Sequence, residues 1–213
     1  MPSSQSGSVR EKRRDREAEL RRADVIAAAS VVFGEKGFQG AQVAEIANTA
    51  ELSLNSVYAL FKGKEELYEA VLYAAAATIR DEVQAKAEAL SDPADQLLSI
   101  IDTLFACFDD HRDLMRIYAR ATSGLPWRVR EAMGEDSFTV LQEFTAWLVS
   151  VAQRASKQGS ISGIDPETLA LSLIGTITTS ASRWIEDPKQ ESLAKAAPRV
   201  RSLFEHLIAS ENS

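Results

Sequence analysis

The stretch SLNSVYALFKGKEEL, residues 53–67, predicts two helices separated by a short break. Ser53 is a suitable N-cap residue, because its hydroxyl can accept a hydrogen bond from the free amide groups of a first helical turn. The helix that follows has only six or seven residues and is too short to be stable alone. We expect Leu52, Val57 and Phe61 to anchor it to its neighbours, which leaves its polar face outward.

Two further helices are predicted upstream of this stretch. From Val25 the apolar residues recur at the spacing i, i+4, i+7, i+8, and Gly37 is expected to end that helix. A second, shorter apolar stripe follows at Val43, Ile46, Ala47 and Ala50. Residues 42–60 thus form a short helix, a turn and another short helix. This is the helix-turn-helix arrangement, whose second helix enters the major groove of DNA. Periodicity alone does not establish it, since other helical proteins show similar patterns.

The rest of the chain is predicted to be helical throughout. A helix capped by Gly63 runs to about Leu90, and later helices end at Gly124 and Gly159. Pro198 is expected to kink or split the last helix. No segment alternates with period two, so the predicted fold is all-α with about nine helices. Three Asp-Pro pairs each indicate a helix cap followed by proline at the first helical position: Asp92-Pro93, Asp165-Pro166 and Asp187-Pro188.

Charge is distributed unevenly along the 213 residues, whose formal net charge is −7. Residues 1–64 hold ten Lys or Arg and eight Asp or Glu, whereas the remainder holds 14 and 23. A surface that binds a polyanion should therefore lie at the N-terminal end. Residues 1–9 are small and polar and are expected to be disordered. Residues 10–22 contain seven basic and four acidic side chains, which is compatible with a solvated helix start or with an arm that touches phosphates.

Several classes of protein are disfavoured by what the sequence contains. The single cysteine, Cys107, can form no internal disulfide, and two histidines give no zinc-ligand spacing. The longest mainly apolar stretch, residues 70–79, is too short to span a bilayer. We expect a cytoplasmic protein with no membrane partner and no cofactor. No phosphate-binding, dinucleotide-binding or hydrolase motif is present. We interpret Cys107 as a core residue and His111 as a surface residue rather than as a catalytic pair.

Residues 25–72 resemble the N-terminal DNA-binding domain of TetR/AcrR-family transcriptional regulators. The matching positions are Val25-Ile26, Ala28-Ala29, Phe33, Gly37-Phe38, the run from Val43 to Ala47, Tyr58, Phe61, Lys64-Glu65 and Leu67. The remaining residues match this family only in the number and order of helices. The resemblance implies a basic or disordered arm at residues 1–18, a helix-turn-helix domain at 19–64, and a regulatory and dimerisation domain at 65–213.

The chain departs from the family pattern at four places. Glu51 stands where the turn usually has glycine, and a positive φ there would cost about 1 kcal/mol. We expect its carboxylate to face away from the phosphates. Ala41 and Gln42 stand where Ser or Thr usually begins the second helix. Gly63 replaces a small polar residue, and Asn55-Ser56 replace a small polar residue followed by Thr.

The resemblance also implies roles for the exposed residues of the helix-turn-helix. Ser53, Leu54, Asn55 and Ser56 are expected to face the groove, where Asn55 can pair with an adenine edge. Tyr58, Lys62 and Lys64 are expected to contact phosphates, with Gln42 near the DNA backbone. The alternatives are a half-buried packing role for Tyr58 and solvated side chains for the two lysines.

The implied protein is a homodimer that reads a palindromic, inverted-repeat operator in double-stranded DNA and is a repressor released by a small, largely apolar effector. Its last two helices are expected to form the dimer interface. Arg116, Arg120 and Arg183 are possible anchors for an anionic group. A helical carrier of hydrophobic molecules with a vestigial helix-turn-helix is the alternative, and ordinary core is the alternative for the pocket. The candidate pocket residues are Phe105, Phe108, Met115, Tyr118, Trp127, Phe138, Phe144, Trp147 and Thr176.

Overall fold

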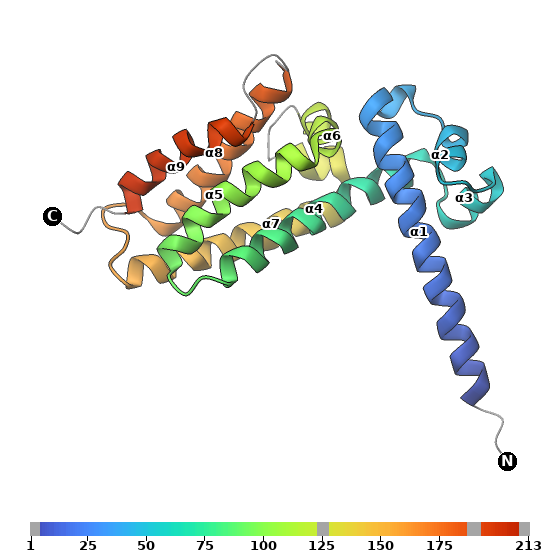
Figure 1. Cartoon of the computed structure of the whole chain (residues 1–213), viewed down its shortest axis with the longest axis horizontal. Helices are drawn as coiled ribbons and strands as arrows, with labels where there is room; N and C mark the ends of the chain where they lie inside the picture. Colours follow the sequence, from blue (N-terminus) through green and yellow to red (C-terminus); the bar gives the residue numbers. More distant parts are fainter. Residues whose placement is uncertain (1–4, 123–127, 187–192, 209–213) are drawn as a thin grey trace. The chain divides into compact units, whose positions relative to one another are not determined.

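A computed structural model of the chain describes residues 5–122, 128–186 and 193–208; the side chains of 5–9, 113, 114, 120, 185, 186 and 194 are not described. Over these ranges it contains nine helices and no strand, which confirms the predicted all-α class (Figure 1). The predicted features at Gly124, Trp127 and Asp187-Pro188 lie outside the described residues. The helices are α1 (Gln5–Gly40), α2 (Val43–Thr49), α3 (Leu54–Leu60), α4 (Lys64–Glu88), α5 (Pro93–Asp110), α6 (Arg112–Thr122), α7 (Val129–Lys157), α8 (Pro166–Glu186) and α9 (Leu193–Ile208).

The chain divides into two compact units, Met1–Val71 and Leu72–Ser213, and α4 runs through the boundary. In the first unit, α1 and α2 pack together and α2 packs against α3. Gly37 has a φ of +69° and separates two helical segments within α1, as its predicted role as a terminator requires. The core of this unit consists of fully buried apolar side chains: Val25, Ala29, Phe33, Ile46, Val57 and Phe61.

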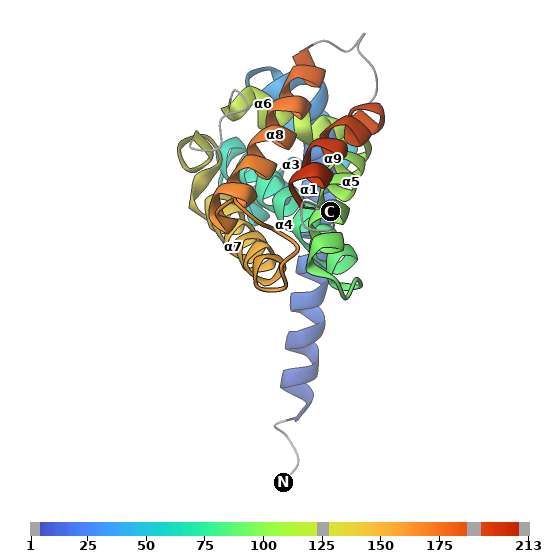
Figure 2. The ribbon, with the colours of Figure 1, turned by 90° about the vertical axis from the view of Figure 1, so that its left-hand side faces the viewer.

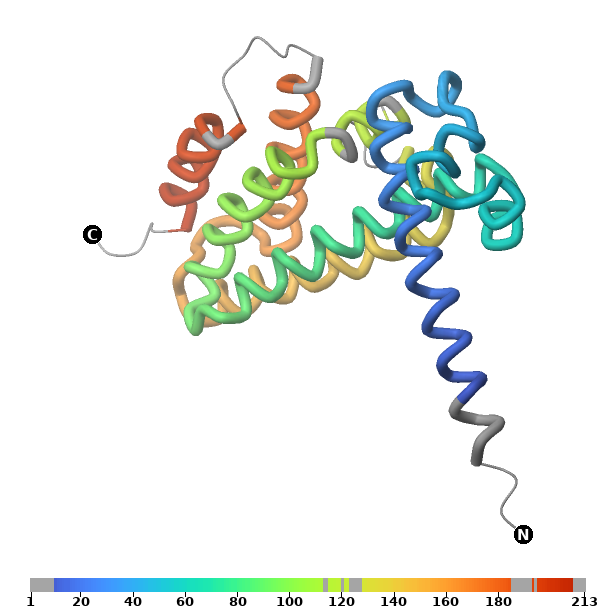
Figure 3. Tube along the Cα trace, turned by 45° about the vertical axis from the view of Figure 1, so that its right-hand side comes forward, coloured from blue at the N-terminus to red at the C-terminus, as the bar shows by residue number. Residues whose placement is uncertain are grey.

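The N-terminal half of α1 differs from the expectation of disorder up to residue 9, because the helix already begins at Gln5. Residues 10–22 are rich in Arg, Glu, Lys, Leu and Ala, which are strong helix formers. Arg13 and Glu17 form an i, i+4 ion pair at 3.0 Å. Every described residue from 10 to 24 is exposed except Arg22, so this half of α1 continues beyond α2 and α3 without packing on them (Figure 3).

The turn between α2 and α3 is built around Glu51, which adopts a positive φ of 55°. The Leu52 N–H donates to the carbonyl of Ala47 at 2.9 Å, and the Glu51 N–H donates to that of Asn48 at 3.1 Å. These two bonds define a Schellman motif, in which the left-handed residue is usually glycine. Glu51 therefore adopts the positive φ that is expected to cost about 1 kcal/mol at this position.

In the second unit, α5 packs against α6, α7, α8 and α9, and Figure 2 shows α9 beside it. Asp92 caps α5 by accepting from the Ala94 N–H at 2.7 Å, and Asp165 caps α8 by accepting from the Thr168 N–H at 2.8 Å. The latter bond lowers the pKa of Asp165. Pro198 lies inside α9 and does not divide it. Among the described residues, no helix has both the length and the apolar character needed to cross a membrane.

Candidate nucleic-acid interface and internal cavity

The short helix α3 has one anchored face and one exposed face. Ser53 is its N-cap: its Oγ accepts from the Ser56 N–H at 3.1 Å and lies 2.7 Å from the Ser56 Oγ. Val57 and Phe61 are 1% and 2% exposed, which confirms them as anchors, and Leu52 is half-buried. The helix is therefore held by its apolar side, as its shortness requires.

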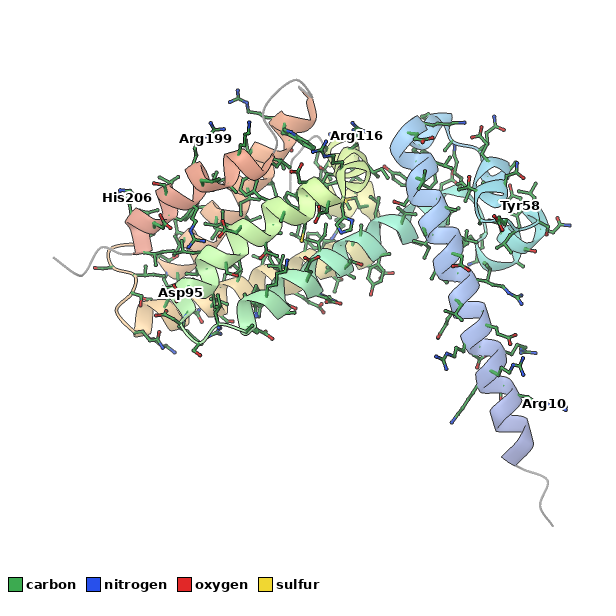
Figure 4. The ribbon with its side chains drawn as sticks, in the orientation of Figure 1. Arg10, Tyr58, Asp95, Arg116, Arg199 and His206 are labelled. Carbon is green, nitrogen blue, oxygen red and sulfur yellow. The ribbon has the colours of Figure 1, made fainter. Side chains whose placement is uncertain are left out.

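The opposite face of α3 presents hydrogen-bonding and small apolar groups. Ser53, Leu54 and Asn55 are exposed, and Ser56 is half-buried. Tyr58, labelled in Figure 4, has 49% of its surface exposed. Lys62 follows the helix and is also exposed. Together we call these residues the α3 surface (residues 53–56, 58 and 62).

Gln42 is exposed at the N-terminus of α2, where its N–H donates to the Glu45 carboxylate at 3.3 Å. The same carboxylate pairs with the Lys36 ammonium at 2.6 Å. The bond to Lys36, and to a smaller degree the Gln42 N–H, lower the pKa of Glu45. Glu45 therefore fixes the start of α2 and leaves the Gln42 side chain outward.

Lys64 lies in a different setting from Lys62. Its ammonium donates to the carbonyl of Ala41 at 3.2 Å and lies 4.6 Å from the centre of the Phe38 ring. The Lys64 side chain is half-buried, so it is not the solvated side chain that was the alternative to a phosphate contact. It links the start of α4 to Ala41, two residues before α2, and this interaction stabilises the arrangement of the helix-turn-helix.

Arg22 is a residue of this unit that the sequence reasoning missed. Its guanidinium donates to the carbonyl of Leu60 at 2.9 Å and lies 4.1 Å from the centre of the Phe61 ring. A cation at the last turn of α3 interacts favourably with the helix dipole. Arg22 precedes Val25 and Ala29 by three and seven residues. This helical spacing places Arg22 on the buried face of α1, and it could have revealed the role of Arg22 from the sequence.

A cavity of about 140 Å³ lies inside the second unit, bounded by α4, α5, α6, α7 and α8. Four of the predicted pocket residues line it, namely Phe108, Met115, Tyr118 and Phe144. Most of its wall was not predicted, because aliphatic side chains that line a cavity have the same spacing as ordinary core. The unpredicted lining residues are Leu72, Ala75, Ala76, Ile79, Arg80, Leu104, Val129, Met133, Ser137, Val140, Leu141, Ile174, Ile177 and Thr178.

The other predicted pocket residues within the described part of the chain lie outside the cavity. Phe105 is completely buried in the core of this unit. The Trp147 indole N–H donates to the Glu88 carboxylate at 3.2 Å, and the Phe138 ring is covered by the Arg130 guanidinium at 4.1 Å. Thr176 uses its hydroxyl to bond the Ser172 carbonyl at 2.7 Å. Each of these side chains is thus occupied by helix packing or by local polar interactions outside the cavity.

The cavity is nearly apolar, and its one described cationic side chain is already paired. Arg80 contacts the Asp81 carboxylate at 2.8 Å and the Glu143 carboxylate at 3.2 Å, and these bonds raise its pKa, Asp81 contributing most. Burial raises the pKa of Tyr118. Arg116 and Arg183 are exposed and do not line the cavity, and the Arg120 side chain is not described. None of the three arginines is therefore seen to supply an anion-binding group to this cavity.

Cys107 is buried in α5, where desolvation raises the pKa of its thiol to about 12. Burial therefore disfavours the thiolate, which is the nucleophilic form of a cysteine. This agrees with the interpretation of Cys107 as a core residue.

Comparison with known proteins finds a family match within the N-terminal unit. Residues 25–71 match the profile of the family described as "Bacterial regulatory proteins, tetR family". A curated relative, the HTH-type transcriptional regulator HbdR of Aromatoleum sp. (strain CIB), is 28% identical over 107 residues. That match spans 50% of this chain and 47% of HbdR, so the chain spans less than half of this relative.

Solved structures extend the similarity to the whole fold. The fatty acid degradation regulator FadR from Bacillus halodurans has a TM-score of 0.74 at 18% identity, covering 90% of this chain and 96% of that one. FadR from Bacillus subtilis in complex with stearoyl-CoA has a TM-score of 0.71 at 19% identity, covering 90% and 99%. At these identities the structures show a shared all-α fold. Residues 25–71 of this chain are therefore similar to the tetR family of bacterial regulatory proteins, and a relative that matches half of the chain is a transcriptional regulator.

Proposed function

We propose that this protein is a homodimeric repressor that reads an inverted-repeat operator with the α3 surface and is released by a small, largely apolar ligand. The observation that carries the DNA-reading part is the two-sided construction of α3. Val57 and Phe61 fix the helix in the unit, while Ser53, Leu54 and Asn55 remain exposed. A reading helix needs this combination, because its outward side chains must reach base edges from a rigid support.

The roles on the α3 surface follow from side-chain chemistry. An Asn55 amide can donate to and accept from the same adenine edge, and the Leu54 side chain can pack on a thymine methyl group. Tyr58, Lys62 and Gln42 are exposed at positions suited to phosphates, which fix register rather than sequence. We propose that Lys64 mainly stabilises the domain, and that at most one further N–H of its ammonium donates to a phosphate.

We further propose that residues 1–18 act as a basic arm, 19–64 as the DNA-binding domain, and 65–213 as the regulatory and dimerisation domain. The dimer would form through α8 and α9. Leu171, Leu203 and Leu207 are 52%, 55% and 38% exposed on these helices. Gly175 has open space around it on α8. Large apolar side chains beside a small residue are suited to close helix packing against a second copy of the chain.

The ligand would occupy the apolar cavity and act by population shift. A ligand that prefers one arrangement of the dimer moves the equilibrium by its difference in affinity between the two arrangements. Because α4 contributes Leu72, Ala76 and Ile79 to the cavity wall and begins at Lys64 beside Ala41, it is the element we assign to couple the two events. The complex of Bacillus subtilis FadR with stearoyl-CoA supports this proposal, because it is a ligand-bound protein of the same fold.

A carrier of hydrophobic molecules with a vestigial helix-turn-helix is the second candidate, and the same cavity would serve it. The two candidates differ in whether α3 reads DNA. Replacing Asn55 by Ala should weaken binding to a selected operator by about 1–3 kcal/mol, the usual loss for one bidentate base interaction. Electrophoretic mobility shift with purified protein measures it. Gln153→Ala, which removes an exposed amide from the second unit, is the control. Equal affinity of both variants would refute the assignment of α3 as the reading helix.

A further inference from the structure

Ser137 carries a buried hydroxyl that has no hydrogen-bond partner within the described part of the chain. The residue is 2% exposed and lines the cavity bounded by α4, α5, α6, α7 and α8. Buried hydroxyl groups are normally paired, because losing their bonds to water is costly. An unpaired hydroxyl at the wall of a nearly apolar cavity therefore requires an explanation.

The helix around Ser137 explains why the hydroxyl is unpaired. A helical Ser or Thr can bond the carbonyl four residues earlier, and eight such bonds occur among the described residues. Thr139 makes one of them with Glu135 at 3.0 Å. For Ser137 the corresponding carbonyl belongs to Met133. Between them Gly134 has φ +84° and ψ 170°, which breaks the helical path and removes that acceptor.

The size and polarity of the cavity limit what Ser137 can bind. Its volume of about 140 Å³ is close to that of an engineered apolar cavity, about 150 Å³, that holds benzene. The two carboxylates on Arg80 already neutralise the one cation of the described lining. An anionic ligand would therefore lose its water without gaining an unpaired cation, whereas a neutral polar group would need only one hydrogen bond.

We propose that the cavity binds a small neutral ligand, an aromatic ring or short aliphatic group that carries one hydroxyl or carbonyl, and that Ser137 hydrogen-bonds this group. The inference rests on the proposed function, in which the cavity is the effector site. It adds the class of ligand and the side chain that selects it. The break at Gly134 is the structural device that frees the Ser137 hydroxyl for this role.

The test uses the full-length protein and three probes of similar size. Benzyl alcohol and ethylbenzene have nearly the same shape and differ in the hydroxyl, and benzoate carries a negative charge. Titration calorimetry should show that Ser137→Ala lowers the affinity for benzyl alcohol about ten-fold, which corresponds to the loss of one hydrogen bond. The affinity for ethylbenzene should change less than about two-fold. Benzoate should bind more weakly than benzyl alcohol.

Ser182→Ala is the matched control, since Ser182 is the other described buried hydroxyl without a partner and does not line the cavity. It should leave the affinity for both neutral probes unchanged. Ala76→Leu, which fills space at the cavity wall, should weaken both. Thermal melting of each variant without probe shows whether it is folded.

The inference is overturned if Ser137→Ala binds benzyl alcohol as the unmodified protein does, if benzoate binds more tightly, or if none of the probes binds. Operator binding in the absence of probes is measured on the same samples. If the proposed function is wrong, the protein will not bind operator DNA, although the probe affinities still depend on Ser137. Failure of this inference would appear as normal DNA binding with no dependence on Ser137.

Discussion

Among single residues, Glu51 in the turn before α3 holds a strained backbone conformation. Glu51 holds a positive φ of 55° at the position of a Schellman motif that glycine normally fills. Its side chain is exposed, so no packing in this unit offsets the strain. The turn therefore carries a backbone strain that a glycine at the same position would remove.

We predict that Glu51→Gly raises the free energy of unfolding of the N-terminal unit by about 1 kcal/mol, because glycine adopts this φ without a Cβ clash. Urea denaturation followed by circular dichroism measures the change. Glu51→Ala removes the charge and retains the Cβ atom, so it should give no such gain. Equal stabilisation by both variants would mean that the charge, and not the backbone conformation, is responsible.

Basic side chains of this unit have different roles although they are of the same type. Lys62 and Lys64 are equivalent in a sequence pattern, yet only the Lys64 ammonium is bound to a backbone carbonyl and an aromatic ring. Arg22 lies in a basic run but stabilises the end of α3. A basic residue near a helix-turn-helix therefore cannot be assigned to phosphate from the sequence alone.

Among the helices, the N-terminal half of α1 is an exposed basic segment that includes Arg10 (Figure 4). Replacing Arg10, Lys12, Arg14 and Arg16 with Gln should reduce the slope of log K against log salt by about 0.9 for each phosphate that the variant no longer neutralises. Sequence preference and stability should not change, because these side chains are exposed and touch no core residue. Operator titrations at several salt concentrations measure the slope.

Lys157→Gln and Lys195→Gln serve as controls for the arm, since both remove exposed cations of the second unit. They should leave the salt dependence as it is. An unchanged slope in the arm variant as well would support the other interpretation of residues 10–22, a solvated helix start with no role in DNA binding.

The outer faces of α8 and α9 are the second feature that belongs to whole helices. Arg199 and His206 are labelled on α9 in Figure 4, and Leu203 lies between them in sequence with 55% of its surface exposed. Leu203→Asp should dissociate the proposed dimer, because a carboxylate would be buried without a partner. Sedimentation equilibrium measures the mass. Leu20→Asp, at a 59% exposed leucine of α1, should leave it unchanged, and equal masses for both variants would exclude this interface.

Across the whole molecule, features set by local chemistry were predictable and features set by packing were not. Ser53, Asp92 and Gly37 act as the sequence predicts, because caps and breaks depend on a few neighbouring residues. The cavity depends on five helices at once, so Phe105 and Trp147 could not be separated from Phe108 and Phe144 by spacing. The start of α1 was misplaced because residues 5–9, which include Ser and Gly and are not strong helix formers, continue the helix of the charged segment that follows them.

The proposed function depends on two copies of α3 reading an inverted repeat. The decisive experiment is the selection of bound duplexes from a random DNA pool with the full-length protein. We expect enrichment of a palindromic site whose half-sites are spaced near one helical turn, or a multiple of it, and loss of that enrichment in Asn55→Ala. A pool that remains random, or that yields the same palindrome with Asn55→Ala, would show that α3 does not read DNA in this way.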